Sequence, residues 1–254
     1  MKRLLFFAIT TLTLSFSLSA IVSTARATTP VVAPFPKIPE TVANSTVAPI
    51  LHIDSHELYN RMNLSSKINF EVFDLAIKGY LRINKRKEII TLVDFSKPST
   101  QERLYVLDLK QEKVLFASHV AHGRNSGQNF ATSFSNKSGS YQSSLGFYLT
   151  EGTYQGKNGY SLILDGLEKG INDNARARAI VMHGANYANP SVIGGSGRLG
   201  RSLGCPALPP SINKPVIDAI KNGSVLFIYG NDESYTKKSP ILSSRDMTLE
   251  AKLK

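Results

Sequence analysis

The sequence contains a single cysteine, Cys205, in 254 residues. One cysteine excludes an intramolecular disulfide, so the thiol forms an intermolecular bridge, serves as a small buried apolar group, or is kept for its reactivity. Gly204 and Pro206 flank it within a polar loop, and this setting favours the reactive thiol over the buried one.

Acidic residues are scarce, with 19 Asp and Glu against 30 Lys and Arg and a net charge of +11. Without Lys2, Arg3 and Arg26, which lie in the first 27 residues, 27 basic residues still face the same 19 acidic ones. A basic protein suits an anionic partner, such as an envelope polymer or a membrane face. Nucleic acid is the weaker partner, because no basic motif is interleaved with aromatic residues. Internal repeats are also lacking.

A long apolar run occurs at the N-terminus, where residues 4–22 follow Lys2-Arg3. Thr and Ser dilute this run, and Ala25-Arg26-Ala27 forms an A-x-A cleavage site. The pattern predicts a secretory signal peptide over residues 1–27 and an exported protein of the periplasm or cell envelope. A retained membrane anchor is the alternative, and the polar content and the cleavage site argue against it. After cleavage we expect no membrane span, and no cysteine stands directly after the cleavage site to carry a lipid anchor.

Beyond the signal, the chain divides into four further segments. Five prolines predict an extended linker over residues 28–52. Apolar residues at three- and four-residue steps predict two short helices within residues 53–88. Residues 231–254 are expected to form a charged, loose tail. Residues 89–230, which lie between the helices and the tail, are expected to form a mostly β domain with a few peripheral helices. The expected strands are 88–94, 104–108, 114–120, 146–150, 161–164, 179–182 and 224–229, and the expected helices are 172–178 and 211–222, the latter capped by Ser211.

The stretch from Ile180 to Pro209 concentrates the chemistry. An apolar run ends on His183-Gly184, and a glycine-rich loop leads to the single cysteine. A thiolate is the attacking form of cysteine, and a neighbouring imidazolium lowers the pKa of a thiol. Gly204 leaves room for backbone N–H groups to point at one spot, where an oxyanion would form. The polar segment 122–144 is too long to be a passive loop and is expected to be functional.

These motifs resemble the murein L,D-transpeptidases, the YkuD-like family, whose signature is His-Gly, a short gap, then Ser or Thr, any residue, Gly and Cys. His183-Gly184 and residues 202–205 match it, and Gly200 to Ala207 reads like the second YkuD-type branch. Further segments fit that branch as well: 93–96, 122–124, 134–136, 143–146, 166–168 and 178–181. The resemblance runs from about residue 90 to Tyr229.

The resemblance implies an L,D-transpeptidase-like β-sandwich or barrel. It also implies that Cys205 attacks the L,D bond of a peptidoglycan tetrapeptide stem, releases D-alanine and forms a thioester. A second stem resolves the thioester into a 3-3 crosslink, whereas water would give an L,D-carboxypeptidase; a D-amino acid or a protein lysine are other acceptors. His183 would be general base and then acid, the Gly184 carbonyl would orient its ring, and the N–H groups of residues 203–205, Gly204 included, would form the oxyanion hole. No cofactor or metal is implied.

Two departures from the family pattern concern substrate binding. Leu203 stands where many relatives have His, and Ala207 where they have Arg, the residue credited with a substrate carboxylate. A guanidinium binds a carboxylate bidentately, so Arg201 or, less favoured, Arg198 is expected to replace it; the alternative is a solvated loop arginine. The other candidate substrate contacts are Ser202, Leu203, His122, Tyr187 and Asn136, and for the last three a loop-bracing role is the alternative. His119 is expected to be packed, and His52 and His56 to have no catalytic role.

Two rival functions remain. One is a papain-like cysteine peptidase or amidase of wall peptides, in which we would expect Cys before His along the chain, whereas here His comes first. The other is a catalytically silent wall-binding module with an incidental cysteine. The intact pair of His183 and Cys205 argues against the second rival.

Overall fold

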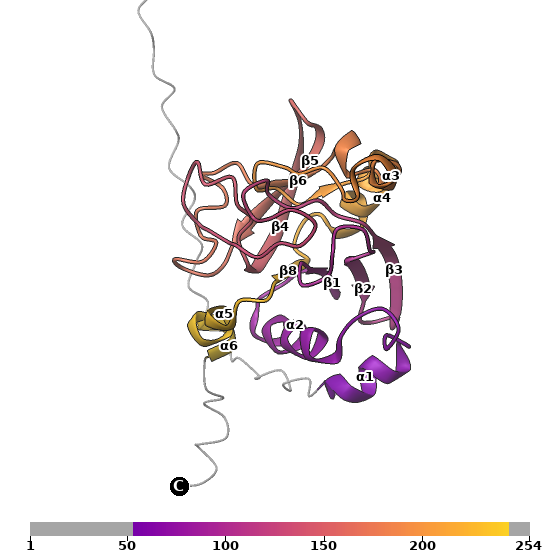
Figure 1. Ribbon diagram of the computed structural model, residues 1–254. Coiled ribbons are helices and arrows are strands. Elements are labelled where there is room, and N and C mark those ends of the chain that lie inside the picture. The colour runs from indigo at the N-terminus through magenta and orange to yellow at the C-terminus, as the bar shows by residue number, and fades with distance from the viewer. Residues whose placement is uncertain (1–52, 244–254) are drawn as a thin grey trace, which may run out of the picture. The chain divides into compact units, whose positions relative to one another are not determined.

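The computed structural model describes residues 53–243 and shows an eight-stranded sheet with short helices around it (Figure 1). The predicted signal peptide, the linker and the end of the tail lie outside the described residues. The strands are β1 Ile89–Asp94, β2 Leu104–Asp108, β3 Lys113–Ser118, β4 Gly146–Gly156, β5 Gly159–Gly166, β6 Val181–Gly184, β7 Ala207–Leu208 and β8 Val225–Tyr229. The helices are α1 Ser55–Arg61, α2 Phe70–Arg82, α3 Ile193–Ser196, α4 Pro210–Ile220, α5 Glu233–Lys238 and α6 Pro240–Ser243, with 3-10 turns at Asn186–Ala188 and Pro190–Val192.

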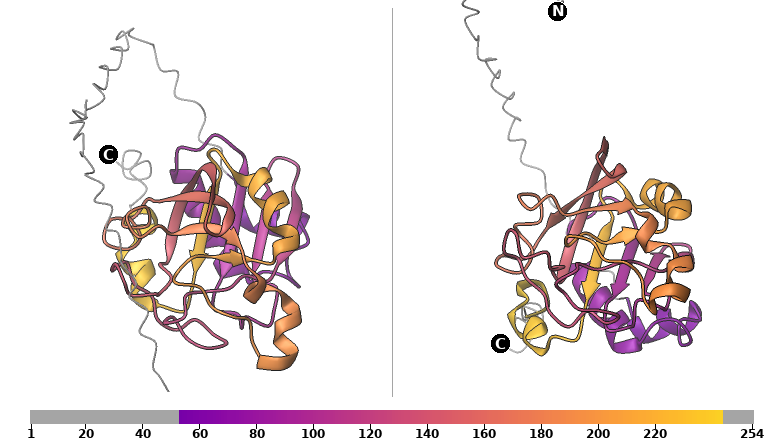
Figure 2. Two further views of the ribbon diagram at one scale, coloured as in Figure 1. Left: turned by 90° about the horizontal axis from the view of Figure 1, so that it is seen from above. Right: turned by 45° about the horizontal axis from the view of Figure 1, so that its top comes forward.

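The strand order is β3-β2-β1-β8-β4-β5-β6-β7. The pairs β1–β8 and β6–β7 are parallel and the others antiparallel. Ala121, just after β3, pairs with Ala207 of β7 through N···O contacts of 2.8 and 3.3 Å. Since β3 and β7 are the two ends of the strand order, this bridge nearly closes the sheet into a barrel. The mostly β prediction is therefore confirmed, and the tip of the β4–β5 hairpin extends beyond the other strands (Figures 1 and 2).

The two N-terminal helices predicted within residues 53–88 are present as α1 and α2, and α1 begins at Ser55 with Asp54 as its N-cap. Asp54 accepts hydrogen bonds from the backbone N–H groups of His56 and Glu57, as an N-cap does. The Ser55 hydroxyl instead donates to Asp74 of α2 at 2.6 Å. Asp54 therefore caps α1, and the neighbouring Ser55 links α1 to α2 through a hydrogen bond.

Helix α2 packs directly against the sheet because one of its positions has no side chain. A Cβ built on Gly79 would lie 2.0 Å from the ring of Phe147 on β4. Phe147 in turn stacks on Phe227 of β8, with ring centroids 4.2 Å apart. Both rings are fully buried, so neither can move aside without disturbing the core.

Replacing Gly79 with alanine should therefore destabilise the fold, although alanine is the better helix former. We expect a loss of about 1–3 kcal/mol in the free energy of unfolding, typical of an overpacked core, measured by urea denaturation. Gly152→Ala is the matched control, since a Cβ there meets nothing within 4 Å. Equal stability of the two variants would contradict the packing argument.

Two predicted segments differ from the structure. Residues 172–178 form consecutive turns rather than a helix, because the Asn172 side chain bonds the backbone of Glu168, Leu145 and Phe147. The prediction of a loose tail was wrong for residues 233–243, which form α5 and α6. Among residues 53–243, no helix combines the length and the apolar character needed to cross a membrane.

A buried carboxylate ties these C-terminal helices to the sheet. Glu168 accepts hydrogen bonds from the Phe147 N–H at 2.7 Å, from the Tyr235 hydroxyl at 3.0 Å and from the Ser239 hydroxyl. Burial raises the pKa of Glu168 above its ordinary value, and these three donors oppose the rise. Tyr235 and Ser239 are the reason why a polar, aperiodic segment is ordered.

Helix α4 begins at Pro210, with Pro209 as its cap, and ends at Ile220; the prediction placed it over 211–222 with Ser211 as its cap. Asn213 in its first turns is buried and donates to the Tyr160 carbonyl at 2.9 Å. A Cβ on Gly184 would lie 3.1 Å from Asn213, so α4 packs closely on the end of β6. The helix thereby fixes the strand end that carries the predicted catalytic histidine.

Candidate active site

The parallel pairing of β6 and β7 brings the two predicted catalytic residues together. His183 lies opposite Ala207, which is two residues after Cys205. The Cys205 sulfur lies 3.5 Å from the backbone nitrogen of Val181, two residues before His183 on the same strand. Two residues of a strand span about 6.6 Å, so His183 lies one strand repeat along β6 from the backbone group that contacts the sulfur.

The His183 ring is held in one tautomer. Its Nδ1 lies 3.0 Å from the carbonyl oxygen of Gly184, the contact expected from the resemblance. A carbonyl only accepts, so Nδ1 carries the proton and Nε2 has a free lone pair. Burial lowers the pKa of His183 below its ordinary value, and the Gly184 carbonyl opposes this. The ring is therefore a neutral base at neutral pH.

The Cys205 thiol is not ionised by an imidazolium, contrary to the expectation from the sequence. Burial raises the pKa of the thiol above its ordinary value, while the Val181 N–H and the Arg178 guanidinium lower it less. The residue is 9% exposed, and its thiol points to the Ala179 carbonyl at 3.7 Å. Among the described residues, no hydrogen bond joins the sulfur to His183. The resting pair is a neutral thiol and a neutral imidazole.

The turn that holds Cys205 is organised by the side chain of Ser202. Its hydroxyl donates to the Cys205 carbonyl at 2.7 Å and accepts the Gly204 N–H at 3.0 Å. Gly204 has φ +125°, a conformation that favours glycine. The expectation that the Gly204 N–H forms part of the oxyanion hole is therefore corrected, because Ser202 already uses it. The N–H groups of Leu203 and Cys205 make no hydrogen bond within the described residues and remain available.

The long polar segment 122–144 lies across this turn. The Ser143 hydroxyl accepts the Gly123 N–H at 3.0 Å and donates to the Gly204 carbonyl at 3.3 Å. The Gln142 carbonyl is so close that a Cβ on Gly204 would lie 2.8 Å from it. The segment thus covers one side of the cysteine turn, and no side chain larger than hydrogen fits at position 204.

His122 is buried and has both ring nitrogens engaged. Its Nδ1 accepts from the Arg103 guanidinium at 2.8 Å, and its Nε2 faces the Gly127 carbonyl at 3.5 Å. Burial, followed by the charge of Arg103, lowers the pKa of His122 to about 4. Arg103 is itself fully buried and also binds the Val120 carbonyl at 2.7 and 3.0 Å. As placed, His122 has no free nitrogen for a substrate.

Tyr187 and Asn136 occupy different surroundings. Tyr187 is half-buried, and burial and then the charge of a Cys205 thiolate raise the pKa of its hydroxyl to about 12. That hydroxyl makes no hydrogen bond within the described residues, so it is available near the sulfur. The Asn136 side chain is used in bracing the loop, since it donates to Asp173 at 2.7 Å and accepts the Asn174 N–H at 3.1 Å.

Three arginines gather beside the cysteine turn. Arg201 donates through Nη1 to the carbonyls of Arg124 and Gly127, both at 2.9 Å, and leaves its other guanidinium nitrogens unbonded within the described residues. Burial, then the charges of Arg198 and Arg124, lower the pKa of Arg201. Arg124, Arg198 and Arg201 form no ion pair within the described part of the chain. Leu203, 58% exposed, adds an apolar side chain to the same turn.

Arg178 is the site residue that the sequence analysis did not single out. Its guanidinium is half-buried and donates four hydrogen bonds to the loop that covers the cysteine turn. The signal in the sequence was its place: an arginine directly before the buried run that leads to His183. His119, by contrast, contacts the Thr100 carbonyl at 3.2 Å, and His56 lies in α1.

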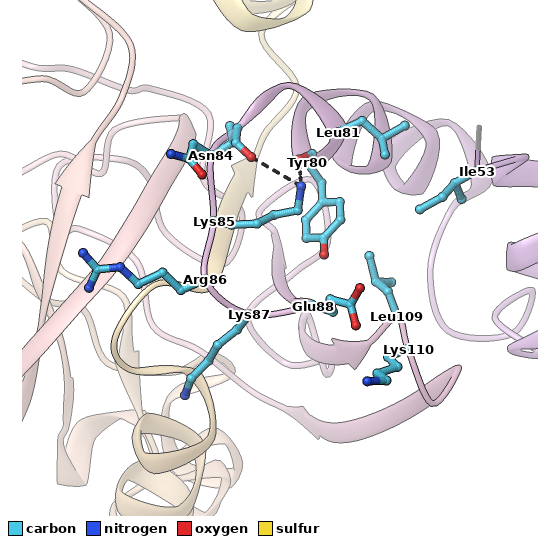
Figure 3. A pocket seen from close by; sticks show the side chains of 11 residues that line it. Ile53, Tyr80, Leu81, Asn84, Lys85, Arg86, Lys87, Glu88, Leu109 and Lys110 are labelled. Atoms are coloured by element: carbon cyan, nitrogen blue, oxygen red, sulfur yellow. Dashed lines mark hydrogen bonds between the residues drawn. The ribbon is translucent and has the colours of Figure 1, made fainter. Parts of the chain in front are cut away.

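A separate pocket of about 490 Å³ lies between α2, the start of β1 and the loop after β2 (Figure 3). Lys85 lines it, with its ammonium group 2.8 Å from the Tyr80 carbonyl, and Lys87, Glu88 and Lys110 are also part of its lining. Neither Cys205 nor His183 contributes to it. Within residues 53–243, no group of three or more His, Cys, Asp or Glu side chains is placed to hold a metal ion.

A family model described as the L,D-transpeptidase catalytic domain matches residues 64–229, which include the turn of Cys205, the strand of His183 and helix α2. The chain belongs to this L,D-transpeptidase family. The match covers most of the described chain and ends with β8, before α5 and α6. No curated protein matches the chain.

Solved structures of two L,D-transpeptidases and of a cell shape determining protein are similar to this chain at low identity. An L,D-transpeptidase from Mycobacterium smegmatis is 13% identical over 56% of this chain and 59% of that chain, with a TM-score of 0.35. One from Stackebrandtia nassauensis is 18% identical over 70% and 76%, with a TM-score of 0.34. The helical cell shape determining protein Pgp2 from Campylobacter jejuni is 16% identical over 63% and 55%, with a TM-score of 0.39. The similarity thus spans 59% of the length of the mycobacterial chain.

Proposed function

We propose that this chain is an exported peptidoglycan L,D-transpeptidase that forms 3-3 crosslinks through a thioester on Cys205. The observations that carry the proposal are the fixed tautomer of His183, whose Nδ1 is held by the Gly184 carbonyl, and the pairing of His183 with Ala207, two residues after Cys205. A neutral base next to a neutral thiol is suited to proton transfer during attack on a carbonyl.

In the first half-reaction, Nε2 of His183 takes the thiol proton while the Cys205 sulfur attacks the carbonyl carbon of the stem's L,D bond. The thiol must first leave the Ala179 carbonyl and turn to the imidazole, which is a rotation about the Cα–Cβ bond of Cys205. The N–H groups of Leu203 and Cys205 receive the oxyanion. The imidazolium then gives its proton to the departing amine, so D-alanine leaves and the thioester remains.

In the second half-reaction, the side-chain amine of another stem attacks the thioester carbonyl. His183 accepts the amine proton and returns it to the sulfur, which restores the neutral pair. Water in place of the amine would release the tripeptide stem, so the same residues support an L,D-carboxypeptidase. The acceptor alone separates the two reactions.

Substrate stems carry carboxylates, and the unpaired arginines beside the cysteine turn suit them. Arg201 has free guanidinium donors, and Arg124 and Arg198 add positive charge without a carboxylate partner within residues 53–243. We propose that this cluster receives a carboxylate of the donor stem in place of the arginine missing at position 207. Leu203 presents an apolar contact beside it.

Arg201→Gln should then weaken stem binding more than catalysis. Hydrogen bonds to charged groups contribute about 1.5–3 kcal/mol, so we expect KM to rise by roughly tenfold or more with a smaller change in kcat. Steady-state kinetics on a tetrapeptide stem measure both constants. The matched control is Arg61→Gln, which changes an arginine at the end of α1 that is paired with Glu112. A KM like that of the wild type would remove Arg201 from the substrate site.

The decisive experiment is incubation of the protein with tetrapeptide muropeptides, followed by mass spectrometry of the products. Loss of D-alanine together with 3-3 dimers supports transpeptidation, and loss without dimers supports the carboxypeptidase. Cleavage at other bonds would instead support a wall peptidase, and no change at all would leave a wall-binding module. Export to the periplasm or envelope forms part of the proposal, and cell fractionation tests it.

A further inference from the structure

A positive charge lies beside the candidate nucleophile and has no acidic partner within residues 53–243. Arg178 is half-buried directly before the run that leads to His183, and its charge lowers the pKa of the Cys205 thiol. A Cβ on Gly204 would lie 3.3 Å from its Nη2, so the guanidinium lies next to the turn that holds the sulfur. The reacting thiol and this arginine therefore share one small space.

The guanidinium is bound by uncharged acceptors. Nη1 donates to the Ser135 carbonyl at 2.7 Å and to the Ser144 hydroxyl at 2.6 Å. Nη2 donates to the Gln142 carbonyl at 2.7 Å and to the Ser140 hydroxyl at 3.2 Å. The four acceptors lie in the loop that covers Gly204, so the planar fork ties this loop to the chain entering β6.

Because these acceptors are uncharged, they do not neutralise the positive charge of Arg178. Arg176, two residues earlier, is exposed and forms a two-pronged ion pair with Asp165. In the described part of the chain, Arg178 has no carboxylate partner of this kind. Burial lowers its pKa, while Tyr148 and Cys205 oppose the change. Among the described residues, Arg178 and Tyr187 interact electrostatically with Cys205, and His183 lies on the adjoining strand. Of these groups only the arginine is a fixed cation at neutral pH. Charge that develops on the sulfur meets this cation.

We propose that Arg178 is a positioning residue of the transferase: it clamps the covering loop over Gly204 and lays a positive charge beside the sulfur of Cys205. The inference rests on the proposed function, because it assigns Cys205 the role of nucleophile. The clamp keeps the cysteine turn in the shape in which the N–H groups of Leu203 and Cys205 are free. The charge favours the thiolate that forms as His183 takes the proton.

The test measures the rate of Cys205 alkylation by iodoacetamide against pH, together with acylation by the carbapenem imipenem at pH 7. For Arg178→Gln we expect the alkylation midpoint to rise by about one pH unit, the lower end of the shift that a close opposite charge produces. Acylation should fall by about tenfold. Arg176→Gln is the matched control and should behave like the wild type. An Arg178→Gln protein that folds and keeps both wild-type values overturns the proposal.

Arg178→Lys separates the effect of the positive charge from the effect of the four hydrogen bonds that the guanidinium donates. Lysine keeps the cation but cannot bind both pairs of acceptors, so we expect a midpoint close to that of the wild type with acylation reduced several-fold. Wild-type acylation in this variant overturns the clamp, and failure of both variants to fold overturns the positioning role in favour of a purely structural one. Alkylation is read on the thiol itself. A wild-type protein that does not process stems would therefore defeat the proposed function while the midpoints still decide the role of Arg178.

Discussion

Cys205→Ala should abolish covalent capture by a carbapenem and all processing of tetrapeptide stems. The reason is chemical: within the sequence, this is the only thiol, and the thioester cannot form without it. Loss of a nucleophile typically costs on the order of 10⁴- to 10⁶-fold in kcat. We expect one adduct per molecule on the wild type and none on the variant, by mass spectrometry of the intact protein.

A loss of activity has this meaning only if the variant is folded. The sulfur is buried and contacts the Val181 N–H, so its removal leaves a small unfilled space. Cys205→Ser keeps the shape and a hydrogen-bonding group, and thermal unfolding of both variants shows whether the fold survives. An adduct that persists on folded Cys205→Ala would place the nucleophile elsewhere and reject the proposed chemistry.

The strands with a clear apolar pattern could be predicted from the sequence, and others could not. The segments 89–94, 104–108 and 225–229 are buried runs with strong β preference, and they appear as expected. Strand β7 has two residues, Ala207 and Leu208, and exists because Ala121 and β6 pair with it. Such a strand is defined by its partners, which lie far away in the sequence.

The helix expected at residues 172–178 and the loose tail failed for the same reason. Local preference favoured a helix at 172–178, but the Asn172 side chain bonds distant backbone groups and holds a series of turns. The tail has no period, yet Tyr235 finds the buried carboxylate of Glu168. In both cases one polar side chain with a tertiary partner outweighs the local pattern.

The catalytic candidates could be proposed from the sequence, whereas their protonation could not be predicted from it. His183 and Cys205 were found by their spacing and glycine-rich setting. The expected imidazolium and thiolate pair depended on burial, which no local pattern reveals, and burial favours the neutral form of both groups. Similarly, the use of the Gly204 N–H by Ser202 depends on the exact fold of the turn.

The neutral pair predicts a distinct pH dependence for the wild type and for His183→Asn. Since burial lowers the pKa of His183, the imidazole of the wild type stays a free base down to below pH ~6.5, and kcat/KM should fall only under that value. Since burial raises the pKa of Cys205, alkylation should keep increasing into the alkaline range. An ion pair would instead give an alkylation rate that is already constant in mildly acidic solution.

His183→Asn removes the base but leaves the thiol. Stem processing and carbapenem acylation should fall by about 10²- to 10⁴-fold at pH 7, the usual contribution of a general base. Alkylation by iodoacetamide above pH 9 should persist, because hydroxide then removes the thiol proton. The matched control is His56→Asn, the same change in α1, which should leave every rate unaltered. If His183→Asn kept its acylation rate, another group would be taking the proton, and the Gly184 carbonyl would be orienting a ring without a part in the reaction.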